Sequence, residues 1–369
     1  MKILFACRSF DNMAGGVERM AIAIMGAMCE RGHDVSLLTW DRDGAASFYP
    51  MDSRISWHKL DLGDHLPKAG WGLRLKRARK VRRIVSALRP DVIIGFQHGT
   101  FISMRLFTLG LGSPVVAAER NAPHRFDHIA AGKHQGFIMQ TFRLANRITI
   151  QCESYRSRYP AAVRPRMVTI PNPVFPAAGF AEPAGTAKAQ KILLSVGRLS
   201  FQKNQMVLLD AFAGLAPEFP EWHLTLAGEG EDRKTLEARI EAHGLQERVS
   251  LPGAVRDVSS LYTASHLFCL PSRWEGFPNA LAEAMSHGLP CVGFAECAGV
   301  RDLVRHGENG LLAEGNCNPR SLAVALREAM SDASLREEMG RNGIASMRDY
   351  GPEKIFDQWD AFFRAVART

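Results

Sequence analysis

The feature that most constrains this chain is the alternation of short apolar runs with segments of helical period. In the first half the apolar runs cover residues 2–7, 34–40, 91–96, 114–118 and 147–152. Continuous apolar runs of this length are typical of buried parallel strands, and segments between them, such as 17–30, have apolar residues at helical spacing. Strands that alternate with helices predict a doubly wound α/β sheet.

A segment rich in proline, alanine and glycine, residues 173–190, interrupts this pattern. The alternation then restarts, with expected strands at 192–196, 223–227, 249–251, 267–270 and 290–294. A chain of 369 residues is also too long for one ordinary core. We therefore predict two Rossmann-like domains, 1–172 and 191–351, joined by a linker and separated by a cleft.

Composition narrows the classes of function only a little. There is no apolar run of about 18 residues, so no membrane span is expected, and the apolar run at the N-terminus is too short for a signal peptide. The seven cysteines are scattered without a C-x-x-C, which indicates reduced thiols in the cytoplasm. The formal charge of +8 is compatible with acidic ligands, with anionic lipid, or with neither.

Three short motifs follow expected strands of the first half. Gly15 and Gly16 precede a helix, where backbone N–H groups favour an anion; a tight turn that needs positive φ is the alternative. His98 follows a strand directly, at the edge where open α/β sheets bind ligands, although taken alone this motif favours a structural histidine. Asp41 and Asp43 form a D-x-D that could bind a divalent metal, but we interpret it as a solvated loop.

The segment 74–83 is unusually basic. On a helix, one face would carry an apolar stripe and the opposite face would carry Lys76, Arg79, Lys80 and Arg83. Neighbouring like charges repel by a few tenths of a kcal/mol each. A polyanion would offset this repulsion, and a bilayer surface, a phosphorylated substrate and nucleic acid are the candidates. A solvated basic face remains the alternative.

Arg198 and Lys203 lie between an expected strand and a helix that begins near Asn204. A helix N-terminus is already a positive pole, so cations there are unfavourable unless an anion binds between them. Arg presents a bidentate fork to phosphate and Lys a mobile point charge. This pair predicts a diphosphate site, and we interpret the nearby stretch 228–230 as a turn beside the nucleotide.

Two carboxylates, Glu275 and Glu283, lie eight positions apart around the next helix start. We expect Pro278 to be the first helical residue, Glu275 to lie at the mouth of the helix and Glu283 about a turn inside. Carboxylates accept two hydrogen bonds, which suits the vicinal hydroxyls of a pyranose or ribose. Backbone N–H groups of 276–279 would face a phosphate; two solvated glutamates are the alternative.

Together these features resemble the GT-B glycosyltransferases of the large retaining family 4, over nearly the whole chain. The residues that carry the resemblance are Gly15, Gly16, His98, Arg198, Lys203, Glu275, Gly276, Phe277, Pro278, Asn279, Glu283 and Gly299. The resemblance implies that Arg198 and Lys203 bind the donor diphosphate. It also implies that Glu283 binds the ribose, that Glu275 binds the donor sugar and that His98 lies against that sugar. The final segment, 352–369, resembles the family's last helix, which crosses back to the first domain.

The mechanism that the resemblance implies is retaining transfer without a metal or any other cofactor. Positive charge on the departing diphosphate would stabilise the transition state. One position departs from the pattern: Asp302 stands where the family often has a glutamate, which leaves its role undecided.

A narrower resemblance concerns the basic helix and the stretch 119–121. They look like those of bacterial members that extend polyprenyl-diphosphate-linked oligosaccharides, with Lys76, Arg79, Lys80, Arg83 and Asn121 as acceptor-binding residues. The leading hypothesis is therefore that the chain transfers a hexose or N-acetylhexosamine from a nucleotide sugar. Among nucleotide sugars, we expect the donor to be a UDP-sugar. The acceptor would be a lipid-linked or lipopolysaccharide-type glycan, and the enzyme would be peripheral at the cytoplasmic, anionic face of the inner membrane.

Two alternatives remain. One is a soluble GT-B transferase that acts on a small sugar. The other is a nucleic-acid-binding protein that uses the basic helix, which we disfavour because residues 74–89 lack interleaved aromatics for base stacking.

Overall fold

The computed structural model describes residues 1–13, 15–63, 70–185 and 190–368. The chain forms two compact units, Met1–Pro173 with Glu353–Thr369, and Val174–Pro352. We describe each unit by itself.

A parallel sheet forms the centre of the first unit. Its strands are β1 (Lys2–Cys7), β2 (Asp34–Thr39), β3 (Ser56–Lys59), β4 (Val92–Phe96), β5 (Val115–Ala118), β6 (Arg147–Ile150) and β7 (Met167–Thr169). Their order is β3-β2-β1-β4-β5-β6-β7, and Leu4 in β1 pairs with Ser36 on one side and Ile93 on the other. The chain order therefore reverses between β1 and β4, which makes their carboxyl ends the topological switch point.

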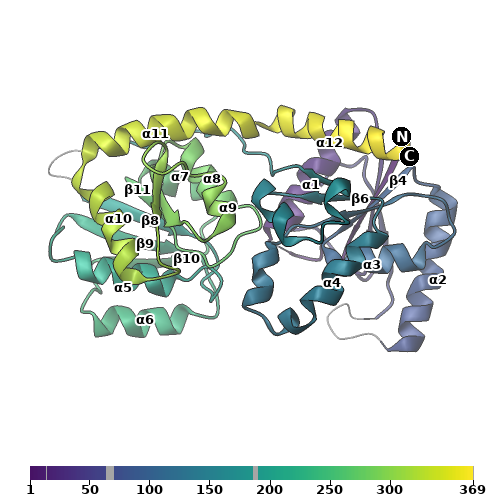
Figure 1. Ribbon diagram of the computed structural model, residues 1–369, viewed down its shortest axis with the longest axis horizontal. Helices are drawn as coiled ribbons and strands as arrows, with labels where there is room; N and C mark the ends of the chain where they lie inside the picture. Colours follow the sequence, from purple (N-terminus) through teal and green to yellow (C-terminus); the bar gives the residue numbers. More distant parts are fainter. Residues whose placement is uncertain (14, 64–69, 186–189, 369) are drawn as a thin grey trace. The chain divides into compact units, whose positions relative to one another are not determined.

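Helices cover both faces of this sheet (Figure 1). They are α1 (Gly16–Glu30), α2 (Trp71–Leu88), α3 (His98–Phe107), α4 (Gln135–Thr141) and α12 (Pro352–Ala367). Helices α1 and α12 share one apolar core with the sheet, and α2 and α3 lie on the opposite face.

The C-terminal helix completes the core of the first unit. Trp359 of α12 is fully buried and its ring stacks on Phe363 at 5.4 Å between centroids. At the surface, Arg31 of α1 forms ion pairs with Glu353 and Asp357 at 2.9 and 2.7 Å. The end of the chain is thus part of the unit that its beginning forms, as the resemblance implied.

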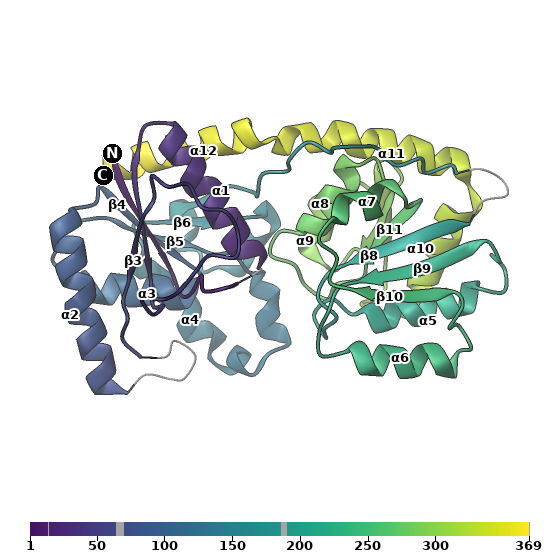
Figure 2. The same ribbon diagram turned by 180° about the vertical axis from the view of Figure 1, so that it is seen from behind.

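The second unit repeats the architecture. Its strands are β8 (Lys191–Val196), β9 (Trp222–Ala227), β10 (Val249–Gly253), β11 (Leu267–Leu270), β12 (Cys291–Phe294) and β13 (Gly310–Ala313). They are parallel in the order β10-β9-β8-β11-β12-β13, and Figure 2 shows β8, β9 and β10 side by side. Here the switch point lies between β8 and β11.

Its helices also form two layers. They are α5 (Gln205–Leu215), α6 (Arg233–Ala242), α7 (Val258–Thr263), α8 (Asn279–Ser286), α9 (Ala298–Arg301), α10 (Pro319–Ser331) and α11 (Ala333–Met347). Helices α5, α6 and α10 pack together on one face, and α7, α8 and α11 lie on the other.

The prediction of a doubly wound sheet is confirmed in each unit, with differences in detail. Strands β3, β7 and β13 were not predicted. Each lies at an edge of its sheet, where a strand has a neighbour on one side only and does not need the continuous apolar run of a central strand. Pro278 is the N-cap of α8 rather than its first helical residue. From Val174 onward, the described residues of the expected linker belong to the second unit, where Ala181 N–H donates to His287 O at 2.8 Å. Among the described helices, none is both long and apolar enough to cross a bilayer.

Candidate functional site

The two loops at the switch point of the second sheet hold most of the predicted donor-site residues. Residues 197–204 connect β8 to α5, and residues 271–278 connect β11 to α8. The carboxyl ends of neighbouring parallel strands meet at one edge, and this edge is where open α/β sheets bind ligands. Chain topology therefore brings Arg198 and Lys203 to the same edge as Glu275.

At the centre of this edge is a part-buried ion pair. Lys203 Nζ lies 2.7 Å from Glu275 Oε1, and Ser272 Oγ donates to the same oxygen at 2.5 Å. The side chains of Lys203 and Glu275 are only 19% and 6% exposed. The sequence predicts that Lys203 binds the diphosphate and that Glu275 binds the donor sugar; in the structure the two side chains also contact each other.

Arg198 is in a different electrostatic situation. Its Nε and Nη2 atoms lie 3.0 and 2.9 Å from Glu231 Oε2, but its side chain is 72% exposed. An exposed ion pair of this kind contributes at most about 1 kcal/mol. Arg198 can therefore exchange Glu231 for an anionic ligand at little cost, whereas Lys203 is held in place.

Close backbone packing holds the Arg198 loop. A Cβ at Gly228 would lie 2.0 Å from Gly197 O, and a Cβ at Gly230 would lie 2.1 Å from Leu199 O. The N–H of Leu199 donates to Glu229 O at 2.9 Å across the same contact. The stretch 228–230, which we expected to be a turn near the nucleotide, thus supports the cationic loop directly.

Glu283 lies within α8, where it is half-buried and accepts a hydrogen bond from Tyr262 Oη at 3.1 Å. The residues between the two carboxylates form the entry to α8. The N–H of Asn279 donates to Phe277 O at 2.9 Å, so it does not face outward as we expected for a phosphate-binding amide.

The loop after β12 lies beside the ion pair. Burial, followed by the nearby carboxylate of Glu275, raises the pKa of the Cys297 thiol to about 12. Gly299 is buried in α9, and Asp302 is exposed at the end of that helix. The predicted residues 198, 203, 275, 283 and 299 therefore all belong to the second unit.

His98 belongs to the first unit, at the N-terminus of α3. The hydroxyl group of Thr141 donates its one proton to Ile138 O at 2.6 Å. Because that proton is already used, Thr141 Oγ1 acts as the acceptor for His98 Nε2, which lies 2.7 Å away. Neutral His98 therefore carries its proton on Nε2 and presents Nδ1 as an acceptor. Burial, together with the positive charge of Arg125, lowers the pKa of His98.

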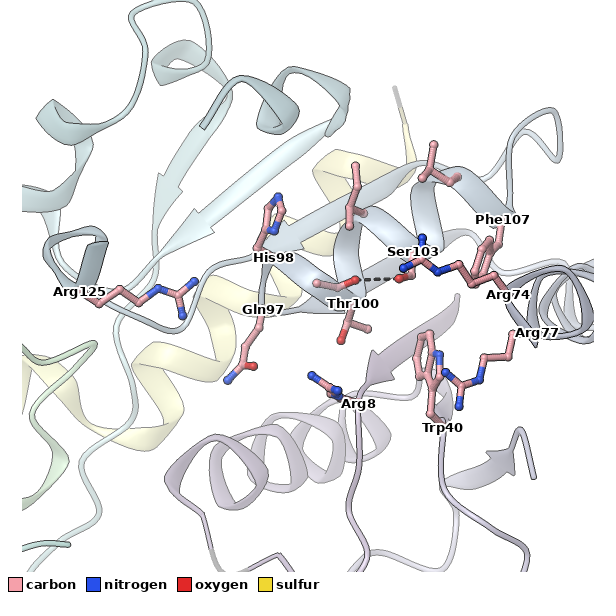
Figure 3. Close-up of a pocket in the computed structure, with 13 residues that line it drawn as sticks. Arg8, Trp40, Arg74, Arg77, Gln97, His98, Thr100, Ser103, Phe107 and Arg125 are labelled. Atoms are coloured by element: carbon pink, nitrogen blue, oxygen red, sulfur yellow. Dashed lines mark hydrogen bonds between the residues drawn. The ribbon is translucent and has the colours of Figure 1, made fainter. Parts of the chain in front are cut away.

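Beside His98 is a cavity of about 510 Å³ (Figure 3). It lies at the carboxyl ends of β1, β2 and β4, the switch point of the first sheet. It is lined by Arg8, Trp40, Arg74, Arg77, Gln97, His98, Gly99, Thr100, Ile102, Ser103, Leu106, Phe107 and Arg125.

The cavity contains two arginines of the basic helix, but not the four cations that we selected. Lys76, Arg79, Lys80 and Arg83 lie on the outer side of α2 and do not line it. Arg77 is buried on the inner face with Val81 and Val85. The signal was present in the sequence, because Arg74 and Arg77 continue the apolar stripe at helical spacing toward the N-terminus of the helix.

The stretch 119–121 proves to be mainly internal. Glu119 and Arg120 are each 5% exposed, and the Arg120 guanidinium lies over the rings of Phe96 and Trp359 at 5.2 and 5.0 Å. Burial lowers the pKa of Arg120 to about 10. The N–H of Asn121, an expected acceptor contact, donates to Glu119 Oε1 at 3.2 Å.

The remaining motifs of the first unit are also defined by local contacts. Gly15 has φ −87°, so the alternative of a turn with positive φ is wrong; instead, a Cβ there would lie 2.1 Å from Glu18 Oε2. Asp41 is buried and accepts from Ser9 Oγ and Phe10 N–H at 2.5 and 2.8 Å. It holds the loop after β1 and is not the solvated residue that we expected.

Two Rossmann-like units, each with polar loops at its switch point, define the GT-B class. The chain has this fold in common with an Anabaena protein crystallised with UDP and glucose, at a TM-score of 0.77 and 19% identity over 99% of this chain and 100% of that one. Among the described residues, no group of three His, Cys, Asp or Glu side chains is placed to hold a metal ion.

Family models and curated relatives identify the chain more closely. Residues 180–346 match the glycosyl transferases group 1 model, and residues 15–173 match the glycosyl transferase 4-like domain. An uncharacterized glycosyltransferase of Haemophilus influenzae is 27% identical over 94% of this chain and 95% of its own. A Campylobacter jejuni α-1,4-N-acetyl-D-galactosaminyltransferase, named for a diphosphate-undecaprenol-linked substrate, is 24% identical over 97% of both. The chain belongs to the group 1 glycosyltransferases, family 4, and transfers a sugar from a nucleotide sugar.

Proposed function

We propose that this chain is a metal-independent, retaining transferase that moves a hexose or N-acetylhexosamine from a UDP-sugar to a lipid-linked or lipopolysaccharide-type glycan. The observation that carries the proposal is the part-buried Lys203–Glu275 pair in the loops that also hold Arg198, at the carboxyl edge of the second sheet. The Anabaena neighbour with bound UDP supports the choice of nucleotide.

In this proposal Lys203 and Arg198 bind the donor diphosphate. The Lys203 ammonium has three donors, so it can hold Glu275 and a phosphate oxygen at the same time. Arg198 turns from Glu231 to the diphosphate and, with Lys203, stabilises the charge that develops on the leaving group. Loss of either cation raises the barrier by at least about 2–3 kcal/mol.

The carboxylates recognise hydroxyl groups. Glu275 accepts from the hydroxyls of the donor sugar and is oriented for this by Lys203 and Ser272. Glu283, oriented by Tyr262, accepts from the ribose. The donor site around these carboxylates is shaped by Gly276, Phe277, Pro278, Asn279 and Gly299. For the first unit, the family resemblance assigns a donor-binding role to Gly15 and Gly16 and a catalytic role to His98.

The basic outer face of α2 fits an acceptor at an anionic membrane. Lys76, Arg79 and Arg83 are exposed, and Trp71 near the start of the same helix is 84% exposed. Exposed cations with an aromatic side chain favour the surface of an anionic bilayer. The Campylobacter relative, whose name includes diphosphate-undecaprenol, supports a lipid-linked acceptor, with Asn121 as a further contact.

The donor proposal is tested by thermal unfolding with UDP, GDP and ADP, followed by donor hydrolysis with the matching sugars. A nucleotide at 100 times its Kd stabilises the chain by about 2.7 kcal/mol. UDP should raise the Tm of the wild type and of Arg320→Gln, an exposed arginine on α10. It should raise the Tm of Arg198→Gln much less. An equal shift in all three proteins contradicts the role of Arg198, and activity lost in EDTA contradicts independence from metal.

The acceptor proposal is tested by pelleting with anionic vesicles and by replacing Lys76, Arg79 and Lys80 with Glu. We expect the triple variant to lose vesicle binding and the use of a diphosphate-linked acceptor, while donor hydrolysis is retained. If the wild type ignores vesicles and glycosylates free sugars, the alternative of a transferase for small acceptors is correct. If hydrolysis falls together with transfer, the outer face of α2 is structural.

A further inference from the structure

An exposed aromatic side chain lies in the loop that carries Arg198 and Lys203. Phe201 is 53% exposed, and its ring centroid lies 6.1 Å from that of Trp274, the residue next to Glu275. Single exposed phenylalanines are common on protein surfaces, so exposure by itself does not indicate a site. The position of Phe201 is unusual because it is two residues from Lys203, which pairs with Glu275. The roles proposed for these charged residues concern phosphate and hydroxyl groups and leave the ring without a function.

Arg273 holds the ring of Phe201 in place. The Arg273 guanidinium lies over that ring, 4.3 Å from its centroid, which is an attractive contact between a cation and an aromatic face. Arg273 Nε also donates to Phe201 O at 3.2 Å, and Arg273 Nη2 donates to Asn204 Oδ1 at 2.9 Å. The backbone and the side chain of Phe201 are therefore both bound to one arginine.

Further hydrogen bonds join the two loops on which this group lies. Arg273 N–H donates to Gln202 O at 2.9 Å, and Gln202 Nε2 donates to Trp274 O at 2.9 Å. A side chain that is ordered before a ligand arrives loses less conformational freedom on binding than a mobile one does. Phe201 is thus a pre-organised flat apolar surface beside the Lys203–Glu275 pair.

A pyranose ring matches this surface chemically. The ring C–H groups of a hexose form apolar patches on its faces, and the face of an aromatic ring is the negative end of a quadrupole, which attracts such C–H groups. A nucleobase also stacks on aromatic rings, but the base of a nucleotide sugar lies beyond the ribose, which we assign to Glu283. Phe201 is bound to the loop of Glu275, which we assign to a sugar.

We propose that Phe201, held by Arg273, is a platform on which a pyranose ring stacks during sugar transfer. The pyranose is the donor sugar or a sugar of the acceptor, because the two meet where transfer takes place. The place of the platform in the reaction rests on the proposed function, whereas the stacking of a pyranose on Phe201 does not.

Saturation-transfer NMR on the full chain tests the proposal, because it reports which protons of a ligand lie against the protein. The donor probes are UDP-glucose, UDP-galactose, UDP-N-acetylglucosamine and UDP-N-acetylgalactosamine. The acceptor probes are the methyl α-glycosides of the same four sugars, added together with UDP. Phe201→Leu removes the flat ring and keeps an apolar side chain, and Phe201→Tyr keeps the ring.

The matched control is Phe180→Leu, at a phenylalanine of the same unit that is 62% exposed. Its neighbour Ala181 contacts His287 at the C-terminal end of α8, away from the loop of Glu275 at the other end of that helix. The uracil and ribose protons of each UDP-sugar give an internal reference, which also shows that a variant is folded.

We expect saturation of the hexose ring protons to fall at least about threefold in Phe201→Leu. It should be retained in Phe201→Tyr and in Phe180→Leu, and the uracil and ribose protons should keep their saturation in every variant. A fall at the hexose of the UDP-sugars identifies the donor sugar as the stacked ring, and a fall at the methyl glycosides identifies the acceptor.

Hexose signals that are absent from the wild type, or equal in the wild type and Phe201→Leu, overturn the proposal. An equal fall in Phe180→Leu overturns it too, as does a fall confined to the uracil protons, which would place the base on the ring. If UDP-sugars bind and react while no hexose signal depends on Phe201, only this inference fails. If the methyl glycosides depend on Phe201 but no UDP-sugar is bound or used, only the proposed function fails.

Discussion

At the scale of single residues, the important finding is that Lys203 and Glu275 depend on each other. They are 72 positions apart and form one part-buried ion pair, in which the carboxylate of Glu275 is the buried partner. Removing one partner from such a pair costs more than removing both, because a buried charge is left without its counter-ion. The roles of the two residues in binding and in folding therefore have to be separated experimentally.

We predict that Lys203→Met destabilises the chain by about 3 kcal/mol, and that the double variant Lys203→Met, Glu275→Gln recovers at least half of this loss. All these variants should lose transfer activity. Urea unfolding gives the stabilities, and donor turnover gives the activities. An equal loss in the single and double variants contradicts the coupling, and near-wild-type turnover in any of them contradicts the proposed roles.

His98 gives a second prediction at this scale, through its lowered pKa. A histidine whose folded pKa lies below its ordinary 6.5 contributes stability that is present above pH 6.5 and is lost as the pH falls through the folded pKa. If neutral His98 is the active form, kcat/KM stays level above pH 6.5 and falls only at lower pH. The acid limb should be absent from the pH profile of His98→Gln. A wild-type midpoint above 6.5 contradicts the lowered pKa.

At the scale of elements, each site depends on loops that strands and glycines hold in place. The loop of Arg198 is packed against Gly228, whose φ of +146° and neighbouring carbonyl leave no room for a side chain. Arg74 and Arg77 depend in the same way on the position of helix α2, which packs on the first unit through the buried side chains of Val81 and Val85. Function in this chain is therefore sensitive to backbone packing at positions that carry no chemistry.

We predict that Gly228→Ala destabilises the second unit by about 2–4 kcal/mol and impairs nucleotide binding, since overpacking and a strained φ each cost about 1–3 kcal/mol. Gly214→Ala in α5 is the matched control, because a Cβ there has nothing within 4 Å. It should be neutral or stabilising by up to about 1 kcal/mol. Thermal unfolding compares the two variants; equal stabilities would contradict the close packing.

At the scale of the whole molecule, the chain forms two units, each built on a parallel sheet, and helix α12 at the end of the sequence packs in the unit that contains residues 1–173. Helix α12 buries its aromatic face in the core of the first unit, more than 170 residues after β7 ends. Its Trp359 also covers the buried Arg120. The first unit therefore depends on residues that are distant along the chain from the rest of that unit.

We predict that Trp359→Ala destabilises the first unit by about 3–5 kcal/mol, the usual range for a large aromatic side chain in a core. Trp71→Ala, at a position 84% exposed, removes the same side chain and should change stability by less than about 0.5 kcal/mol. Denaturant unfolding of both variants measures the difference. A small effect at Trp359 would mean that α12 does not support the first unit.

Much of the fold was predictable because its signals are local. Apolar runs such as 92–96 and 267–270 identify buried central strands, whereas strands β3, β7 and β13 were missed because they lie at sheet edges. The outer cations of α2 were chosen for their number, whereas Arg74 and Arg77, which reach the cavity, had to be recognised as cations on an apolar stripe.

By itself the sequence determined that this chain alternates strands and helices in two halves, and that polar residues follow particular strands, because hydrophobic period and turn chemistry act over a few neighbouring residues. Only the tertiary structure decided that Lys203 meets Glu275 and that Arg8 shares a cavity with Arg77 and Arg125. Those contacts depend on strand order and side-chain packing, which join residues that are distant along the chain.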